Sequence, residues 1–214
     1  MCDNIQLFCG LCRIGVYTLY RRLCCKSSPE TKPNFNVLCI GLTGAGKSAL
    51  LALLSGDEFH NIPPTVGFSI KALIFDDCIL DVKELGGGEN VRPYWDRYFE
   101  GSQGMIYVVD SASTEEDFAT AKSELGKALS NQFLRGLPLL VLANHQDVEG
   151  AKSEAEIARF LELSAETGKR QWMIQACSVV NKLQVEAGFA NLRKVLLGGK
   201  VTAAENGASE TNRI

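Results

Sequence analysis

From residue 35 onward, short apolar runs alternate with longer segments in which apolar residues recur at helical spacing. The short runs predict buried strands at residues 35–40, 105–109, 139–143 and 172–177, and a hairpin formed by residues 68–75 and 79–85. The longer segments predict helices at residues 115–130, 153–163 and 183–197. Strands that alternate with helices are typical of an α/β fold, here a mostly parallel six-stranded sheet with helices on both faces.

The N-terminal segment has a different pattern, because its apolar run contains Arg13 and ends at Arg21 and Arg22. A transmembrane span needs about 20 residues with few or no charges, so this segment is a poor candidate for one. At 100° per residue, an arc of about 120° that excludes the three arginines contains eight residues of this segment: Ile5, Phe8, Cys9, Cys12, Val16, Leu19, Tyr20 and Leu23. This predicts an amphipathic helix lying in a membrane interface, with a secretory signal or a helix packed on the body as alternatives.

The composition is that of one globular domain: 214 residues, 46% hydrophobic and 22% charged. The net charge of −3 is unevenly distributed. Residues 1–35 carry five basic and two acidic side chains, and the rest carries 17 basic and 23 acidic ones. An acidic body excludes nucleic acid as the main partner, whereas the basic N-terminus suits an anionic membrane surface.

Five of the eight cysteines lie within the first 25 residues. Cys24 and Cys25 follow a basic pair, which makes them candidates for S-acylation. Cys9 and Cys12 have no second pair to complete a tetrahedral zinc site. We expect the remaining three to be small core side chains: Cys39, Cys78 and Cys177.

The predicted organisation has four parts. Residues 1–26 form a cysteine-rich, membrane-associating amphipathic segment and residues 27–34, with two prolines, form a linker. Residues 35–197 form the α/β domain. Residues 198–214 are rich in Gly, Ala and Thr without an apolar period and are predicted to be disordered.

A phosphate-binding motif, G-x-x-x-x-G-K-[ST], follows the first predicted strand. Its residues are Gly41, Leu42, Thr43, Gly44, Ala45, Gly46, Lys47 and Ser48, followed by Ala49. The glycines let backbone N–H groups surround phosphates, the following helix adds a partial positive charge, and Lys47 reaches the β- and γ-phosphates. The Ser48 hydroxyl can bind Mg²⁺. The motif alone leaves ATP and GTP, and hydrolase and kinase, open.

Later segments carry further motifs: residues 63–68 (Pro-Pro-Thr-Val-Gly-Phe), residues 85–87 (Leu-Gly-Gly) followed by residues 92–99, and residues 144–147 (Asn-His-Gln-Asp). In this order they resemble switch I, switch II and the guanine-reading N-K-x-D motif of the ADP-ribosylation factor (Arf) family of Ras-like small GTPases. The resemblance implies a monomeric, intracellular GTP/GDP and Mg²⁺ binder at the cytosolic face of a membrane. Its switches and the hairpin between them would contact an effector protein.

The resemblance also assigns roles to individual residues. Asp147 would accept hydrogen bonds from the guanine N1–H and exocyclic amine, Asn144 would hold the base loop, and the backbone around Cys177 and Ser178 would meet the guanine oxygen. Three residues are implied as Mg²⁺ ligands or γ-phosphate contacts in the switches: Thr65, Glu84 and Gly87.

Three positions depart from the family pattern. Gly88 stands where the family has a water-orienting Gln, so intrinsic hydrolysis is expected to be slow or absent, with Glu89 as a weak substitute. Glu84 replaces an Asp, and its extra methylene either disturbs the Mg²⁺ geometry or is absorbed by rearrangement. His145 replaces a Lys that would brace the phosphate loop, and this predicts weaker nucleotide binding.

The resemblance implies that three aromatic residues form the effector-facing surface: Phe68, Trp95 and Tyr98. Burial in the core is the alternative for Trp95 and Tyr98. Because Gly88, Glu84 and His145 all weaken a cycling switch, a non-cycling guanine-nucleotide-binding scaffold or modulator of a membrane protein is the alternative. A nucleotide kinase is a third possibility, but the sequence has no recognisable arginine-rich lid.

Overall fold

The computed structural model describes residues 32–199, which contain a six-stranded sheet in the order β2-β3-β1-β4-β5-β6. The strands are β1 (Asn34–Ile40), β2 (Phe68–Ile74), β3 (Ile79–Leu85), β4 (Gly104–Asp110), β5 (Leu139–Asn144) and β6 (Trp172–Ala176). β2 and β3 pair antiparallel, and the other neighbouring strands pair parallel. The carboxyl ends of five strands therefore meet at one edge of the sheet, where ligands of open α/β sheets bind.

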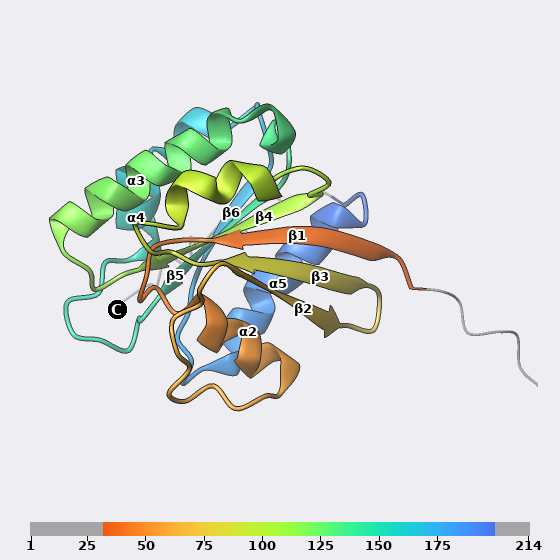
Figure 1. The fold of residues 1–214 in the computed structure, drawn as a ribbon, viewed down its shortest axis with the longest axis horizontal. Helices are drawn as coiled ribbons and strands as arrows, with labels where there is room; N and C mark the ends of the chain where they lie inside the picture. The colour runs from red at the N-terminus through yellow and green to blue at the C-terminus, as the bar shows by residue number, and fades with distance from the viewer. Residues whose placement is uncertain (1–31, 200–214) are drawn as a thin grey trace, which may run out of the picture. The chain divides into compact units, whose positions relative to one another are not determined.

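Helices cover both faces of this sheet. Figure 1 shows α3 and α4 on one side and α2 and α5 on the other. The α-helices are α2 (Lys47–Ser55), α3 (Glu115–Ser130), α4 (Glu154–Phe160) and α5 (Lys182–Leu196). Residues 32–199 also contain three short 3₁₀ helices, each in the connection that leads to a strand: η1 (Arg92–Tyr98), η2 (Gln132–Leu134) and η3 (Leu163–Glu166).

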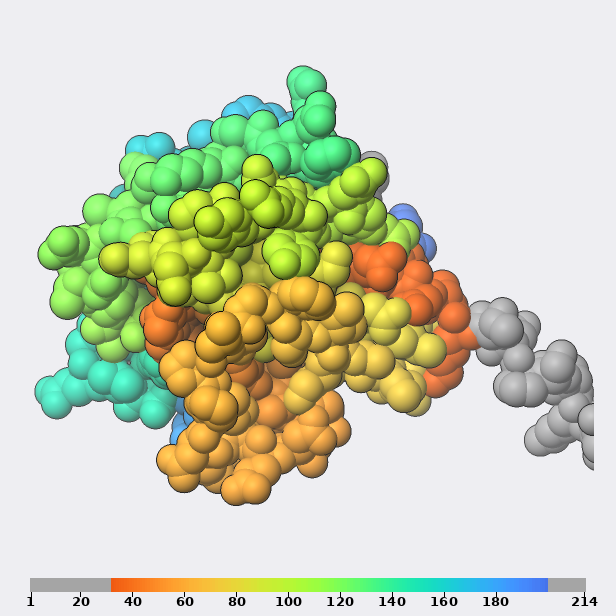
Figure 2. Space-filling model, in the orientation of Figure 1, coloured from red at the N-terminus to blue at the C-terminus, as the bar shows by residue number. Residues whose placement is uncertain are grey.

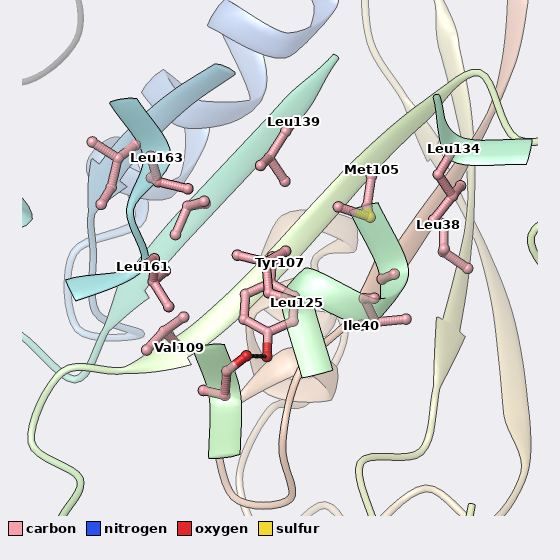
Figure 3. Packing of buried hydrophobic residues seen from close by; sticks show 14 of the residues in the cluster. Leu38, Ile40, Met105, Tyr107, Val109, Leu125, Leu134, Leu139, Leu161 and Leu163 are labelled. Atoms are coloured by element: carbon pink, nitrogen blue, oxygen red, sulfur yellow. Dashed lines mark hydrogen bonds between the residues drawn. The ribbon is translucent and has the colours of Figure 1, made fainter. Parts of the chain in front are cut away.

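The two faces of the sheet bury separate clusters because successive strand residues point to opposite sides. In β4, Tyr107 packs in one cluster with Phe118 of α3, while Ile106 packs in the other with Phe189 of α5. Figure 3 shows the first cluster, where the Tyr107 hydroxyl donates a hydrogen bond to the Ala121 carbonyl oxygen at 2.7 Å. The whole of β5 is buried, as expected for a central strand covered on both faces.

The predicted fold class is confirmed, and each strand differs from its predicted bounds by at most one residue at either end. The predicted helix at residues 115–130 is present with the same bounds. The predicted helix at 153–163 is shorter: Ser153 caps it through a reciprocal capping box with Glu156, and the helix ends at Phe160. Glu162 then adopts a left-handed backbone with φ of 55°, which is incompatible with a continuing helix.

The prediction that Trp95 forms part of an exposed recognition surface is wrong. Trp95 is a residue of η1 that is only 3% exposed, and its side chain packs in the core. Its indole Nε1–H donates to the Gly86 carbonyl oxygen at 2.9 Å, so burial leaves no polar atom of the side chain unsatisfied. Tyr98 is partly buried and its ring contacts that of Phe68, with centroids 5.1 Å apart. Phe68 is about half exposed, at 48%.

The three cysteines of the body are fully buried, as predicted. The amphipathic helix, Cys24 and Cys25 lie outside the described residues, as does the tail from residue 200. Within residues 32–199, none of the helices combines the length and apolar character needed to cross a membrane.

The buried Tyr107 hydroxyl makes a testable contribution to stability. Tyr107→Phe removes one hydrogen bond while keeping the ring, so the free energy of unfolding should fall by about 1 kcal/mol in urea denaturation. Tyr94→Phe is the matched control, because Tyr94 is 50% exposed and water replaces any hydrogen bond its hydroxyl loses. Equal stability of the two variants would show that the Tyr107 bond contributes nothing.

Candidate nucleotide-binding site

The loop between β1 and α2 lies at the edge of the sheet where the carboxyl ends of the strands meet. Its glycines let its backbone approach neighbouring residues closely. A Cβ on Gly41 would lie 2.3 Å from the Val108 carbonyl oxygen. Gly46 has a φ of 88°, and a Cβ there would lie 2.2 Å from Asn144 Nδ2. Both positions therefore require glycine. The loop ends at the N-terminus of α2, whose N–H groups favour an anion.

Lys47 is the buried cation of this loop, with 6% of its surface exposed. Its Nζ donates to the carbonyl oxygens of Gly41 at 2.9 Å and Leu42 at 2.8 Å. Desolvation by burial lowers the pKa of the Lys47 ammonium below its ordinary value. Two of the three ammonium donors are thus held by the loop, and the third is available for a phosphate oxygen.

Three side-chain oxygens from distant segments converge beside Lys47. The Ser48 hydroxyl of α2 and the Thr65 hydroxyl both donate to Glu84 Oε1, at 2.5 and 3.1 Å. The two hydroxyl oxygens are 3.1 Å apart, and Glu84 is 3% exposed. The predicted metal residues Ser48, Thr65 and Glu84 are therefore brought together by the fold.

This donor set fits Mg²⁺, which prefers hydroxyl, carboxylate and phosphate oxygens and takes few ligands from the protein. A hydroxyl can point its proton at Glu84 and still offer a lone pair to a cation. The longer side chain of Glu84 thus reaches both hydroxyls directly. When bound, Mg²⁺ would neutralise charge on the β- and γ-phosphates.

Two successive glycines of switch II contact neighbouring loops, Gly87 the phosphate loop and Gly86 switch I. A Cβ on Gly87 would meet the backbone of Leu42 and Thr43 at 2.3 and 2.4 Å. The Gly86 N–H donates to the Gly67 carbonyl oxygen at 2.8 Å, which joins switch II to switch I. Figure 2 shows the orange segment that carries switch I lying beside the yellow-green segment that carries η1.

The base-reading loops follow β5 and β6. Asn144, fully buried, donates through Nδ2 to the Ala45 carbonyl oxygen at 2.9 Å, which ties this loop to the phosphate loop. The Ser178 hydroxyl donates to Asp147 Oδ1, and this hydrogen bond lowers the pKa of the Asp147 carboxyl. Asp147 is thereby held as a charged, solvent-facing acceptor. Burial raises the pKa of the Cys177 thiol to about 12, so it stays protonated.

Comparison with known proteins is consistent with this geometry. A family model described as the ADP-ribosylation factor family matches residues 21–196. The chain belongs to the Arf family. It is 46% identical over 180 residues to ADP-ribosylation factor-like protein 15 of mouse, covering 84% of this chain and 88% of that one. It is 39% identical over 158 residues to ADP-ribosylation factor-like protein 3 of Chlamydomonas reinhardtii, covering 74% and 88%.

A solved structure shares the fold. The Arl6 small GTPase of Trypanosoma brucei, solved with the bound nucleotide analogue GppNp, matches with a TM-score of 0.70 and 26% identity. The match covers 78% of this chain and 99% of that one. Arf-family proteins bind guanine nucleotide, generally with Mg²⁺, so the site described above is that of an Arf-family nucleotide-binding domain.

His145, which departs from the Arf pattern, has a defined environment. Its backbone is left-handed, with φ of 63°, and its ring Nδ1 lies 2.9 Å from Asp110 Oδ1 at the end of β4. Its Nε2 lies 3.5 Å from the position of a Cβ on Gly46. The imidazole therefore fills space between β4 and the phosphate loop.

Gln146 is a structural contributor that the motif comparison passed over. Its Nε2 donates to the Ser111 hydroxyl at 2.8 Å and to the Lys152 carbonyl oxygen at 2.9 Å. Its backbone N–H donates to the Cys177 carbonyl oxygen at 3.2 Å. Gln146 thus joins the base-reading loop to the segments that carry these three partners. Its sequence signal is its place as the third residue of the Asn-His-Gln-Asp motif, but the resemblance assigns no role to that position.

A cavity of about 540 Å³ opens over the phosphate loop. Ten of the predicted site residues line it: Thr43, Gly44, Gly46, Lys47, Ser48, Ala49, Thr65, Glu84, Gly87 and Gly88. The structure does not bring Glu89 into this cavity. The Glu89 side chain is 94% exposed, and its carboxylate is 3.6 Å from Arg92, on the side that faces α3. Asn90 lines the nucleotide cavity instead, a position that sequence reasoning missed.

The close contact at Gly87 predicts a sensitive substitution. Gly87→Ala places a Cβ inside the backbone of the phosphate loop, so affinity for a fluorescent GTP analogue should fall at least about tenfold, or ~1.4 kcal/mol. Gly126→Ala, in α3, is the control, because no atom lies within 4 Å of the added Cβ. Wild-type affinity in Gly87→Ala would contradict the close contact of switch II with the phosphate loop.

Proposed function

We propose that this Arf-family protein is a GTP-binding molecular switch that acts at a membrane, contacts an effector protein through its switches in the GTP state, and hydrolyses GTP slowly. The observation that carries the proposal is the convergence of Ser48, Thr65 and Glu84. Thr65 belongs to switch I, so a nucleotide-bound Mg²⁺ between these oxygens would hold switch I against the phosphate loop. Loss of the γ-phosphate would release it.

Guanine selectivity is supported by the acceptor at the base loop. An aspartate carboxylate accepts two hydrogen bonds, which matches the N1–H and exocyclic amine of guanine. Adenine presents an acceptor at N1 and leaves such a carboxylate unpaired, which is costly in a closed site. Ser178 orients the Asp147 carboxylate for this role.

Slow hydrolysis is supported by Gly88. A glycine has no side chain to orient the attacking water. Gly88 lines the nucleotide cavity and is not among the glycines with positive φ, so its backbone conformation permits a side chain. An added Cβ would lie 2.9 Å from Asn90 Oδ1, so the Asn90 side chain would have to shift. The glycine at position 88 also favours the second candidate, a non-cycling guanine-nucleotide-binding scaffold that modulates a membrane protein.

The effector surface is supported by apolar side chains exposed around switch I and on the edge strand β2. The exposed residues are Val66 at 92%, Ile70 at 61% and Ile74 at 73%, with Phe68 and Tyr94 each about half exposed. A groove of about 270 Å³ lies beside Phe68, lined by Gly67, Leu85, Asn90, Val91, Tyr94, Trp95, Arg97 and Tyr98. Exposed apolar side chains gathered at one place typically mark a protein-binding site.

Membrane association rests on the amphipathic, basic pattern of residues 1–26 together with Cys24 and Cys25. One weak anchor gives marginal binding, whereas an interfacial helix, basic residues and an acyl chain together hold a protein stably. Placement at the cytosolic face of a membrane follows from this combination and is part of the proposal.

Nucleotide binding is tested by titrating fluorescent GTP, GDP and ATP analogues in Mg²⁺ and in EDTA. Both guanine nucleotides should bind, more tightly with Mg²⁺, and ATP should not. In Asp147→Asn one acceptor becomes a donor, so the preference should shift from guanine to xanthine nucleotides. Absence of guanine-nucleotide binding in the wild type would reject both the switch and the scaffold.

The hydrolysis rate separates the two candidates. Under single-turnover conditions, Gly88→Gln should hydrolyse bound GTP at least about tenfold faster than wild type, because it restores a water-orienting carboxamide. GTP affinity should stay within about twofold. If neither the wild type nor Gly88→Gln hydrolyses bound GTP measurably, the site is not built for cycling and the scaffold is favoured.

A further inference from the structure

Asn90 is an exposed polar residue of switch II that lines the nucleotide cavity. It lies in the loop between β3 and η1 and lines the cavity with Thr43, Thr65 and Gly87. Its neighbour Glu89 points to solvent. Of the two polar residues that follow Gly88, only Asn90 therefore faces the place where a phosphate would lie.

The Asn90 carboxamide lies next to the place where a side chain at position 88 would begin. Asn90 Oδ1 lies 2.9 Å from the position that a Gly88 Cβ would occupy, and Thr43 Oγ1 lies 4.0 Å from it. Asparagine carries the same functional group as glutamine, one acceptor oxygen and an NH₂ with two donors. The group absent at position 88 is thus present two residues later, in adjoining space.

The loop backbone holds Asn90 in this place. The Gly88 carbonyl oxygen accepts from Val91 N at 2.9 Å and from Arg92 N at 3.0 Å, which closes a turn with Asn90 inside it. The start of the turn is fixed at Gly86, whose N–H donates to Gly67 and whose carbonyl accepts from Trp95. A loop fixed before and after Asn90 holds its backbone in place before substrate binds, which limits the positions open to the carboxamide and favours catalysis.

We infer that Asn90 is the water-orienting catalytic residue of this protein, in place of the missing glutamine; the inference rests on the proposed GTP hydrolysis. Oδ1 accepts a hydrogen bond from the attacking water, and Nδ2 is free to donate to a γ-phosphate oxygen. The water oxygen bonds to the γ-phosphorus while the bond from that phosphorus to the β–γ bridging oxygen breaks. GDP leaves with the electron pair, and the water proton passes to the released phosphate.

The test is single-turnover hydrolysis of GTP preloaded on the full chain. Asn90→Ala should lower the wild-type rate at least about tenfold, and GTP and GDP affinities should stay within about twofold. A wild-type rate in Asn90→Ala overturns the inference. The inference is also overturned if the wild-type protein binds GTP but hydrolyses it no faster than Asn90→Ala does. Loss of turnover in Glu89→Ala with unchanged turnover in Asn90→Ala would assign the role to Glu89 and overturn it as well.

A double-mutant comparison distinguishes catalysis from a structural role. In the Gly88→Gln background the glutamine supplies the carboxamide, so adding Asn90→Ala should change the rate less than about twofold. An equal loss in both backgrounds would mean that Asn90 only shapes the loop, and it overturns the inference. Failure of the proposed function is separable, because it would appear first as loss of guanine-nucleotide binding in the wild type.

Discussion

The buried carboxylate of Glu84 is the interaction on which the nucleotide site depends. Glu84 is the penultimate residue of β3, and its carboxylate accepts hydrogen bonds from the first turn of α2 and from switch I. A carboxylate with 3% exposure needs such partners, because a buried charge without hydrogen bonds is strongly unfavourable. The two hydroxyls also hydrogen-bond each other at 3.1 Å, so Glu84, Ser48 and Thr65 form one connected group. The Glu84 side chain thereby links switch I to the first turn of α2.

Much of the fold follows from local pattern. β5 is apolar in all but its last residue, Asn144, and is flanked by turn residues, so its position is evident from the sequence. The α3 helix begins with Thr114 as a side-chain cap and three acidic residues in its first turn. Its buried residues recur at helical spacing. These signals depend on nearest neighbours along the chain, which explains why strand and helix positions agree closely with expectation.

The errors concern side chains whose environment is supplied by distant segments. Trp95 and Tyr98 are both aromatic and lie three residues apart, and sequence pattern gives no reason to bury one and not the other. The Gly86 carbonyl oxygen allows Trp95 to be buried, because it accepts a hydrogen bond from the indole N–H. Asn90 was missed for a similar reason, because the turn closed on Gly88 brings it to the wall of the nucleotide cavity. The phosphate loop was predictable because its chemistry is contained in eight consecutive residues.

Asn90 and Val91 line both the nucleotide cavity and the groove beside Phe68. A molecule that fills the groove therefore touches the same two residues that border the γ-phosphate region. By thermodynamic linkage, a groove ligand that binds one nucleotide state more tightly must also retain that nucleotide more tightly, by the same factor. Through the wall shared by the two cavities, the affinity for a groove ligand and the affinity for nucleotide become two measurements of a single coupling free energy.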